Sequence, residues 1–159
     1  MKAEDHQGEI APPERLWQSP TWLVGQLSGD AHRLIVDAIT AVARTDYAVL
    51  AGLEEFGPLS QAALGRRLGI DRSDISVVLD RLQADRHVTR SPDPAHRSRK
   101  LVQITPTGRR RLERLDTNVK KAQHTLLKPL TPDQATELTS LLQRLVQHHR
   151  GYQHPPAAS

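Results

Sequence analysis

The chain contains no cysteine among its 159 residues, and it has very few aromatic side chains. Without thiols it forms no disulfide, no thiolate metal site and no thiol redox switch. Its aromatic residues are Trp17, Trp22, Tyr47, Phe56 and Tyr152. We therefore expect an aliphatic core. Because the apolar share is only 37%, we also expect some apolar surface to be buried by association with another chain.

Several segments and motifs are missing from the sequence as well. No apolar run is long enough to cross a bilayer and no secretory leader is recognisable, so we expect a cytoplasmic protein with no membrane partner. The sequence has no glycine-rich phosphate loop, no nucleophile elbow and no HExxH motif. We therefore predict that the chain is not an enzyme and has no catalytic residues.

Eight histidines raise the question of a metal site. His148 and His149 are adjacent, so their side chains diverge on a helix. His32 and His124 lie on different predicted helices and could meet only through tertiary packing. We predict no metal and no other cofactor.

Charge is distributed unevenly along the chain, whose net charge is +4. The window from Arg86 to Arg111 holds eight basic residues and one acid, which makes it +7, whereas the remainder holds 14 basic and 17 acidic residues and is −3. One basic block on a mildly acidic body suits a surface that binds nucleic acid. The alternative is a solvated loop and helix start.

The N-terminal half predicts a flexible arm followed by two helices. Residues 1–20 are polar and contain several prolines, as is typical of an arm. Apolar positions then recur at helical spacing over 22–43. Thr45 or Asp46 is predicted to cap a second helix that runs to about Phe56.

Residues 60–84 predict two short helices joined by a glycine. Ser60 caps the first and Gly69 follows its end, while Gly65 is small where the two helices approach each other. Asp71 is predicted to cap the second helix, over 72–84. The residues of this helix that follow the core-facing spacing are Ile75, Val78, Leu79 and Leu82.

A hairpin is predicted next, with strands at 87–90 and 100–104 and a basic turn between them. Helix, turn, helix and hairpin form a winged helix-turn-helix. In that architecture the second helix fits the major groove of DNA, and a cationic hairpin can hold the backbone or enter the minor groove.

Two further helices are predicted at the C-terminal end. Thr105-Pro106 opens one of them, and Thr131 to Gln134 forms a capping box that opens the other. The first carries a coiled-coil seam made of Leu112, Leu115, Val119, Ala122 and Leu126. The second carries a stripe made of Leu138, Leu141, Leu142, Leu145 and Val146.

A compact winged helix cannot bury these two stripes and that of the first helix alone. We therefore expect a homodimer built by the terminal helices; the alternative is a monomer with a helical cap. The predicted fold is mainly α with a small β-hairpin wing. Its parts are a flexible arm (1–20), a helical dimerisation region (21–45 and 106–150), a winged helix-turn-helix DNA-binding domain (46–105) and a tail (151–159).

Several stretches together resemble the MarR-type transcriptional regulators, over about residues 22–150. The matching stretches are Leu64 to Ser76, Leu79 to Leu82, Val88 to Arg90, Asp93-Pro94, Arg97 and Ile104-Thr-Pro-Thr-Gly108. The chain departs from that family at three points. His87 stands where a glycine usually precedes the wing strand, His96 replaces the second wing aspartate, and Val77 replaces a polar or basic reader.

The resemblance implies a dimeric, usually repressing regulator that binds double-stranded DNA sequence-specifically at a pseudo-palindromic operator. Such proteins often respond to a small aromatic or anionic effector bound between the dimer helices and the DNA-binding lobes. Trp22, Gln26 and Tyr47 are our candidates for that pocket, with core packing as the alternative for each. The competing function is a winged-helix module that binds protein or RNA without operator specificity.

Candidate DNA-binding residues come from the recognition helix and the wing. Those on the helix are Arg72, Ser73, Asp74, Ser76, Val77 and Arg81. Arg72 suits a bidentate contact to guanine and Val77 a thymine methyl, whereas Asp74 is also explained as a helix-start acid. Arg81 is predicted either to hold a phosphate or to pair with Asp80. On the wing, Arg97 is assigned to a narrow minor groove, and Arg99 and Lys100 to phosphates.

Overall fold

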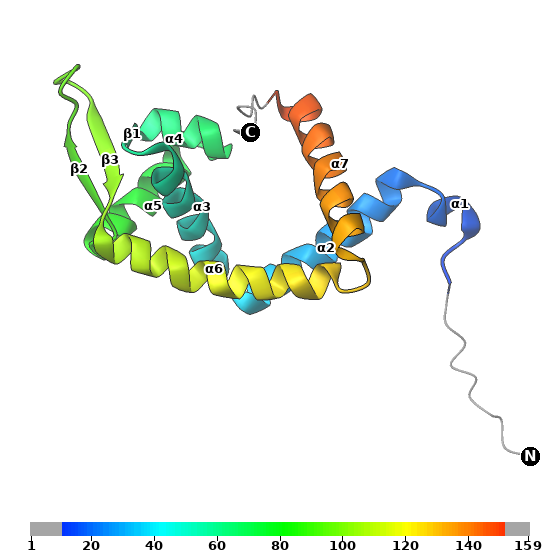
Figure 1. Ribbon diagram of the computed structural model, residues 1–159. Coiled ribbons are helices and arrows are strands. Elements are labelled where there is room, and N and C mark those ends of the chain that lie inside the picture. Colours follow the sequence, from blue (N-terminus) through cyan, green and yellow to red (C-terminus); the bar gives the residue numbers. More distant parts are fainter. Residues whose placement is uncertain (1–10, 152–159) are drawn as a thin grey trace, which may run out of the picture. The chain divides into compact units, whose positions relative to one another are not determined.

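A computed structural model describes residues 11–151 of the chain (Figure 1). The elements in chain order are α1 (Glu14–Trp17), α2 (Pro20–Ala38), α3 (Ala41–Phe56), β1 (Leu59–Ser60), α4 (Gln61–Leu68), α5 (Arg72–Ala84), β2 (Val88–Pro92), β3 (Lys100–Ile104), α6 (Pro106–Leu127) and α7 (Pro132–Arg150). The predicted class, mainly α with a small β wing, is confirmed. The chain divides into two compact units at the boundary between Arg33 and Leu34, inside α2.

The N-terminal unit corrects part of the predicted flexible arm. Residues 1–10 lie outside the described part, but α1 is helical and α2 begins at Pro20. Proline suits the first position of a helix because its missing N–H would have no partner there. The rings of Trp17 and Trp22 meet edge to face, with their centroids 6.4 Å apart.

The boundary between the first two long helices was predicted in the wrong place. The sequence predicted one helix over 22–43 and a cap at Thr45 or Asp46, whereas α2 ends at Ala38 and Thr40 caps α3. The Thr40 hydroxyl accepts a hydrogen bond from the Ala43 N–H at 3.2 Å. Asp46 consequently lies inside α3, where it is buried.

The core of the C-terminal unit joins α3, α4, α5 and the sheet, and within the described residues it is aliphatic as predicted. All four predicted inward residues of α5 are buried. The core members are Val49, Leu50, Leu53, Leu64, Ile75, Val78, Leu79, Leu82, Val88, Val102 and Ile104. Burial of their side chains fixes α5 on one side and leaves its other side to solvent.

The sheet has one strand more than the predicted hairpin. The short strand β1 pairs antiparallel with β3, so the strand order is β1-β3-β2. β2 also extends further than predicted, to Pro92, which lies opposite Lys100. Proline is tolerated there because β2 is an edge strand whose outer N–H groups need no partner in the ladder.

The turn between α4 and α5 follows the sequence prediction. The Ser60 hydroxyl accepts a hydrogen bond from Ala63 N–H, and Gly69 ends α4 in the left-handed conformation. A Cβ atom on Gly65 would lie 3.0 Å from the carbonyl oxygen of Ile70. The close approach of α4 to the turn that follows it therefore explains why residue 65 is glycine.

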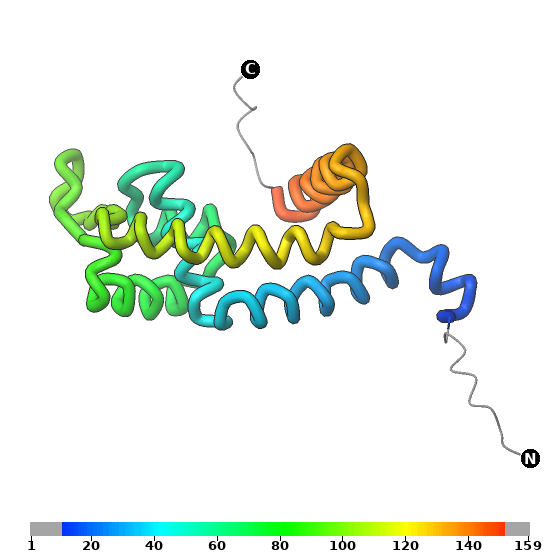
Figure 2. The backbone as a smooth tube through the Cα atoms, turned by 60° about the horizontal axis from the view of Figure 1, so that its bottom comes forward, coloured from blue at the N-terminus to red at the C-terminus, as the bar shows by residue number. Residues whose placement is uncertain are grey.

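One junction joins the end of α5, the start of β2 and the start of α6, and Figure 2 shows how these three segments meet at the base of the wing. The Thr105 hydroxyl donates to the carbonyl of Arg86 at 2.7 Å and accepts the N–H of Gly108 at 3.0 Å. A Cβ on Gly108 would lie only 2.1 Å from the carbonyl oxygen of His87. The Ile-Thr-Pro-Thr-Gly stretch thus fastens α6 to the wing.

The backbone at this junction also shows where the glycine that usually precedes the wing strand is missing. The sequence pattern assigned this departure to His87. Arg86, and not His87, has the positive φ, 61°. Glycine adopts this left-handed conformation without strain, whereas a residue with a Cβ atom pays about 1–2 kcal/mol there. The position at which a glycine is missing is therefore residue 86.

The two C-terminal stripes have different surroundings. Leu115 and Val119 of the α6 seam are buried against Ile39 and Ala43 of the same chain, so this part of the seam does not await a partner, contrary to the prediction. The α7 stripe differs, because none of its residues is buried. Four of its apolar side chains are exposed by 38–52%: Leu141, Leu142, Leu145 and Val146.

Replacement of Gly108 by alanine tests the junction. We expect Gly108→Ala to lower the free energy of unfolding by about 2–3 kcal/mol, because the added methyl group has to displace the backbone at His87. Chemical denaturation followed by circular dichroism measures this change. Gly25→Ala is the matched control: nothing lies within 4 Å of its added Cβ. The control should keep or slightly raise the stability of the protein; equal effects of both substitutions would contradict the close contact.

Candidate nucleic-acid interface

The recognition helix α5 presents one continuous polar side to solvent. Its inward residues are buried in the core, and this fixes the rotation of the helix about its axis. The predicted DNA-reading residues consequently lie on the open side, with Ser76 half-buried and Arg72, Ser73, Asp74 and Val77 exposed. Val77 is 64% exposed, a large fraction for an apolar side chain with no partner in the core.

The start of α5 differs from the prediction in one detail. Asp71 occupies the predicted N-cap position, but its side chain makes no capping hydrogen bond. Asp74 lies in the first helical turn, where a carboxylate is favoured by the helix dipole. A hollow of about 470 Å³ is bordered by α4 and by this turn, and Gln61, Arg66 and Arg72 are among the residues that line it.

Arg81 forms an ion pair within the protein. Its guanidinium pairs with Asp46 of α3, whose residue surface is only 7% exposed. The predicted local pair between Asp80 and Arg81 is wrong, because neighbouring residues on a helix point in different directions. Arg81 therefore ties α5 to α3, and its proposed phosphate contact competes with that role.

Arg90 makes contacts with α5 that the sequence did not predict. It lies in β2, and its Nη1 donates to Asp80 Oδ1 at 2.6 Å and to Gln83 Oε1 at 2.9 Å. Both partners belong to α5, so the wing strand and the recognition helix are linked through side chains. The only signal for Arg90 in the sequence was the excess of basic residues over 86–111, and that excess did not indicate which residues Arg90 would contact.

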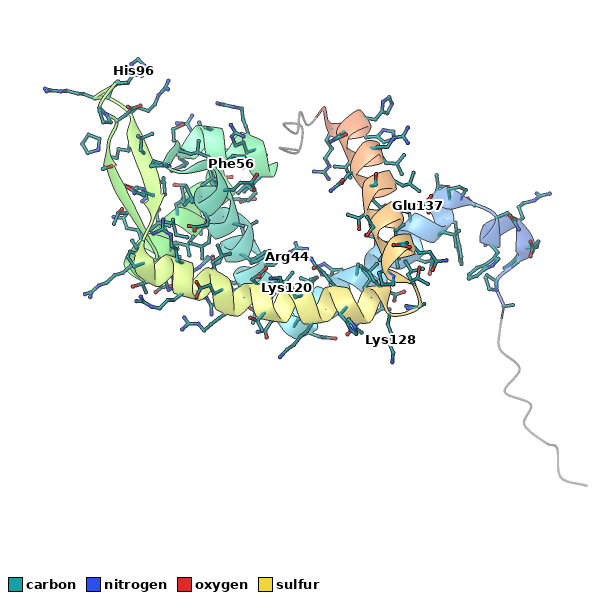
Figure 3. The ribbon with its side chains drawn as sticks, viewed as in Figure 1. Arg44, Phe56, His96, Lys120, Lys128 and Glu137 are labelled. Carbon is teal, nitrogen blue, oxygen red and sulfur yellow. The ribbon has the colours of Figure 1, made fainter. Side chains whose placement is uncertain are left out.

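The tip of the wing is a closed turn although it lacks the second aspartate. Asp93 Oδ1 accepts the Ala95 N–H at 2.8 Å, and Asp93 N–H donates to the Arg99 carbonyl at 2.8 Å. Arg97, Arg99 and Lys100 are exposed. None of the three forms an ion pair with any residue that the structure describes. Figure 3 shows the neighbouring His96 at the outer end of the hairpin, away from the helices.

Tyr47 borders a hollow of about 350 Å³ between α3 and α6. Its hydroxyl donates to Asp116 Oδ1 at 3.1 Å, and Lys120 Nζ lies 2.6 Å from Asp116 Oδ2. Burial, followed by the bond to Asp116, raises the pKa of Tyr47 above 10.0. The bond from Lys120 is the main cause of the lowered pKa of Asp116. The carboxyl group of Asp116 is therefore ionised at neutral pH.

The charged groups that line this hollow are mostly acidic. It contains four carboxylates and one guanidinium, that of Arg109, which pairs with Glu54 at 2.8 Å. Such a lining favours a neutral or cationic molecule over the anionic effector that we expected. Trp22 and Gln26 belong to the N-terminal unit, and their part in an effector pocket stays a prediction.

Residues 11–151 include no group of three or more histidine, aspartate or glutamate side chains placed to hold a metal ion.

In the same part of the chain, no helix has both the length and the apolar character that crossing a membrane requires.

Comparisons with known proteins point to one family. A model of the MarR family matches residues 42–97. The chain is 26% identical over 100 residues to the HTH-type transcriptional repressor NicR of Pseudomonas putida, a match that covers 63% of each protein. A probable transcriptional regulator from Pseudomonas aeruginosa is 31% identical, with a TM-score of 0.71, and the match covers 82% of this chain and 99% of that one.

A further solved structure is the PcaV regulator of Streptomyces coelicolor in complex with its natural ligand. It is 29% identical, has a TM-score of 0.68, and the match covers 87% of this chain and 98% of that one. The matched stretch of the family model runs from α3 to Arg97 at the wing tip and so includes all of α5 and β2. The chain belongs to the MarR family of transcriptional regulators.

Proposed function

We propose that this regulator is a homodimeric repressor that binds a pseudo-palindromic operator in double-stranded DNA and responds to a small-molecule effector. The observation that carries the proposal is the exposed face of α5 together with three exposed wing cations, Arg97, Arg99 and Lys100, that pair with no carboxylate among the described residues. An exposed face with Arg72, Ser73 and Val77 offers hydrogen-bonding and methyl-contacting groups to base edges. The name of the relative NicR, a repressor, supports the sign of regulation.

Operator contacts are assigned residue by residue. Arg72, Ser73, Ser76 and Val77 read base edges or phosphates in the major groove, and Asp74 accepts from cytosine or serves the helix start. Arg97 enters the minor groove, where the negative potential is strongest when the groove is narrow. Arg99 and Lys100 neutralise phosphates, so binding should weaken steeply as salt rises.

The dimer is proposed to form through the exposed stripe of α7, together with the apolar residues of α2. Leu23, Val24 and Leu27 of α2 are exposed by 36–51%. Burial of such side chains between two copies would remove them from water, which is the main driving force for association. Two recognition helices would then reach half-sites about 34–36 Å apart on one face of the DNA.

An effector is proposed for the hollow beside Tyr47, because PcaV was crystallised with a natural ligand. The acidic lining of that hollow modifies the expectation about its chemistry. A molecule with a neutral or positively charged group would meet four carboxylates without like-charge repulsion.

Selection of bound DNA from a random pool tests the function. We expect the purified chain to enrich an inverted repeat, with half-sites one helical turn apart, and to lose affinity steeply as salt is raised. Sequencing of the selected pool and fluorescence anisotropy give the two readouts. Enrichment of no sequence would contradict the repressor and favour a winged-helix module that binds protein or RNA.

Substitution of Arg72 tests the reading face. Arg72→Ala should weaken operator binding by about tenfold or more and relax the preference at one base pair, because a bidentate contact to guanine is worth about 1–3 kcal/mol. Arg114→Ala removes the same charge from an exposed site on α6 and should change affinity by less than about threefold. Similar losses from both variants would reject a specific role for Arg72.

Substitution of Leu145 tests the dimer. Leu145→Glu should convert the dimer to a monomer at micromolar concentration, because it places a charge in the proposed apolar interface. Gln147→Glu adds the same side chain near the opposite face of α7 and should leave the dimer intact. Light scattering after size exclusion measures both masses. A monomeric wild-type protein would refute the proposed assembly.

A further inference from the structure

Arg90 differs from the other cations of the wing in being held by α5. Its side chain is only 19% exposed, and one of its nitrogen atoms donates to both Asp80 and Gln83. Hydrogen bonds between charged groups are shorter and stronger than neutral ones. The positive charge of Arg90 is thus used inside the protein, whereas Arg97 at the wing tip is exposed.

We propose that Arg90 is a positioning residue, which with Asp80 and Gln83 forms a clamp that fixes the angle between the wing and the recognition helix. The clamp acts through Arg97: it holds the wing so that Arg97 reaches the minor groove while α5 lies in the major groove. This inference rests on the proposed function, since it requires that α5 and the wing bind the same DNA.

Packing explains why the wing needs such a clamp. At its base, Val88 and Val102 are buried in the core and hold the strands by apolar contact. Beyond Arg90, residues 91–99 contain no buried side chain, so nothing apolar anchors the outer hairpin. Each strand residue advances about 3.3 Å, and a small rotation at the base therefore moves the tip by several ångströms. Arg90 is the ladder partner of Val102, so it lies at the outer limit of the anchored base, where the free part of the hairpin begins.

The clamp also changes the charge beside the reading face. Asp80 lies on α5 with its side chain 65% exposed, and a carboxylate beside a DNA groove would repel phosphates. Pairing with Arg90 neutralises that carboxylate. The pair therefore removes a repulsion near the reading face and aligns the wing at the same time.

A purely structural ion pair would behave differently. Because the Asp80 side chain is 65% exposed, water screens this ion pair, and it contributes little to stability. If stability were its only role, Asp80→Asn would leave the contribution of Arg97 to DNA binding unchanged. The clamp predicts that this contribution falls, because a wing at a variable angle places Arg97 in the groove for only part of the time.

A double-mutant cycle on the selected operator separates these two roles. Arg97→Ala is measured in four backgrounds: wild type, Asp80→Asn, Arg90→Gln and Thr89→Ala, the last being an exposed neighbour on the same strand. We expect a loss of about tenfold in the wild-type and Thr89→Ala backgrounds, and of less than about threefold in the two clamp variants. Thermal unfolding identifies any background that fails to fold. If Arg90→Gln fails to fold, Asp80→Asn still tests the clamp, because Asp80 is exposed.

Distance measurement tests the wing angle without DNA. The chain contains no cysteine, so Ala84→Cys and Ser98→Cys can carry a pair of spin labels without background. Both positions are exposed, one on α5 and the other at the wing tip. Electron spin resonance should give a narrow distance distribution in the otherwise wild-type protein and a broader one after Asp80→Asn.

The outcomes distinguish this inference from the function on which it rests. Equal losses from Arg97→Ala in all four backgrounds, no loss in the wild-type background, or an unchanged distance distribution would each overturn the clamp while operator binding stands. Failure of the wild-type chain to select any DNA sequence would overturn the proposed function, and the role of the clamp in recognition with it.

Discussion

The hydroxyl of Thr105 holds together the three segments on which the wing depends. It donates to the backbone that leaves α5 and accepts from the backbone that begins α6. Gly108 allows the segments to approach closely, since any Cβ there would collide with the carbonyl of His87. The hairpin emerges between those two segments, so its direction relative to α5 is set first by this junction and only then by side chains farther out.

The basic block of the sequence divides into groups with different tasks once the chain is folded. Arg90 and Arg109 are paired with carboxylates of α5 and α3, respectively. Arg97, Arg99 and Lys100 are exposed at the outer hairpin. Positive charge in the sequence therefore marks both cations that are paired within the fold and cations that are left to solvent, and only the positions of the acidic partners separate the two.

Local chemistry made much of the fold predictable. The caps at Ser60, Thr105 and Thr131 and the glycine at the end of α4 act within a few residues, so their patterns are visible in the sequence. The break between α2 and α3 was missed, because apolar residues continue at helical spacing on both sides of Thr40. The pairs Arg81–Asp46 and Arg90–Asp80 were also missed. Their partners lie 35 and 10 residues apart and meet only after α3, α5 and β2 have packed.

The length of α6 has a mechanical consequence. This helix starts at the base of the wing and continues without interruption for 22 residues, or about 33 Å. A stiff rod of that size transmits displacement at one end to the other with little loss. Any molecule or subunit that shifts the far end of α6 would thereby tilt the base of the hairpin, so events remote from the proposed DNA-binding face could alter its geometry.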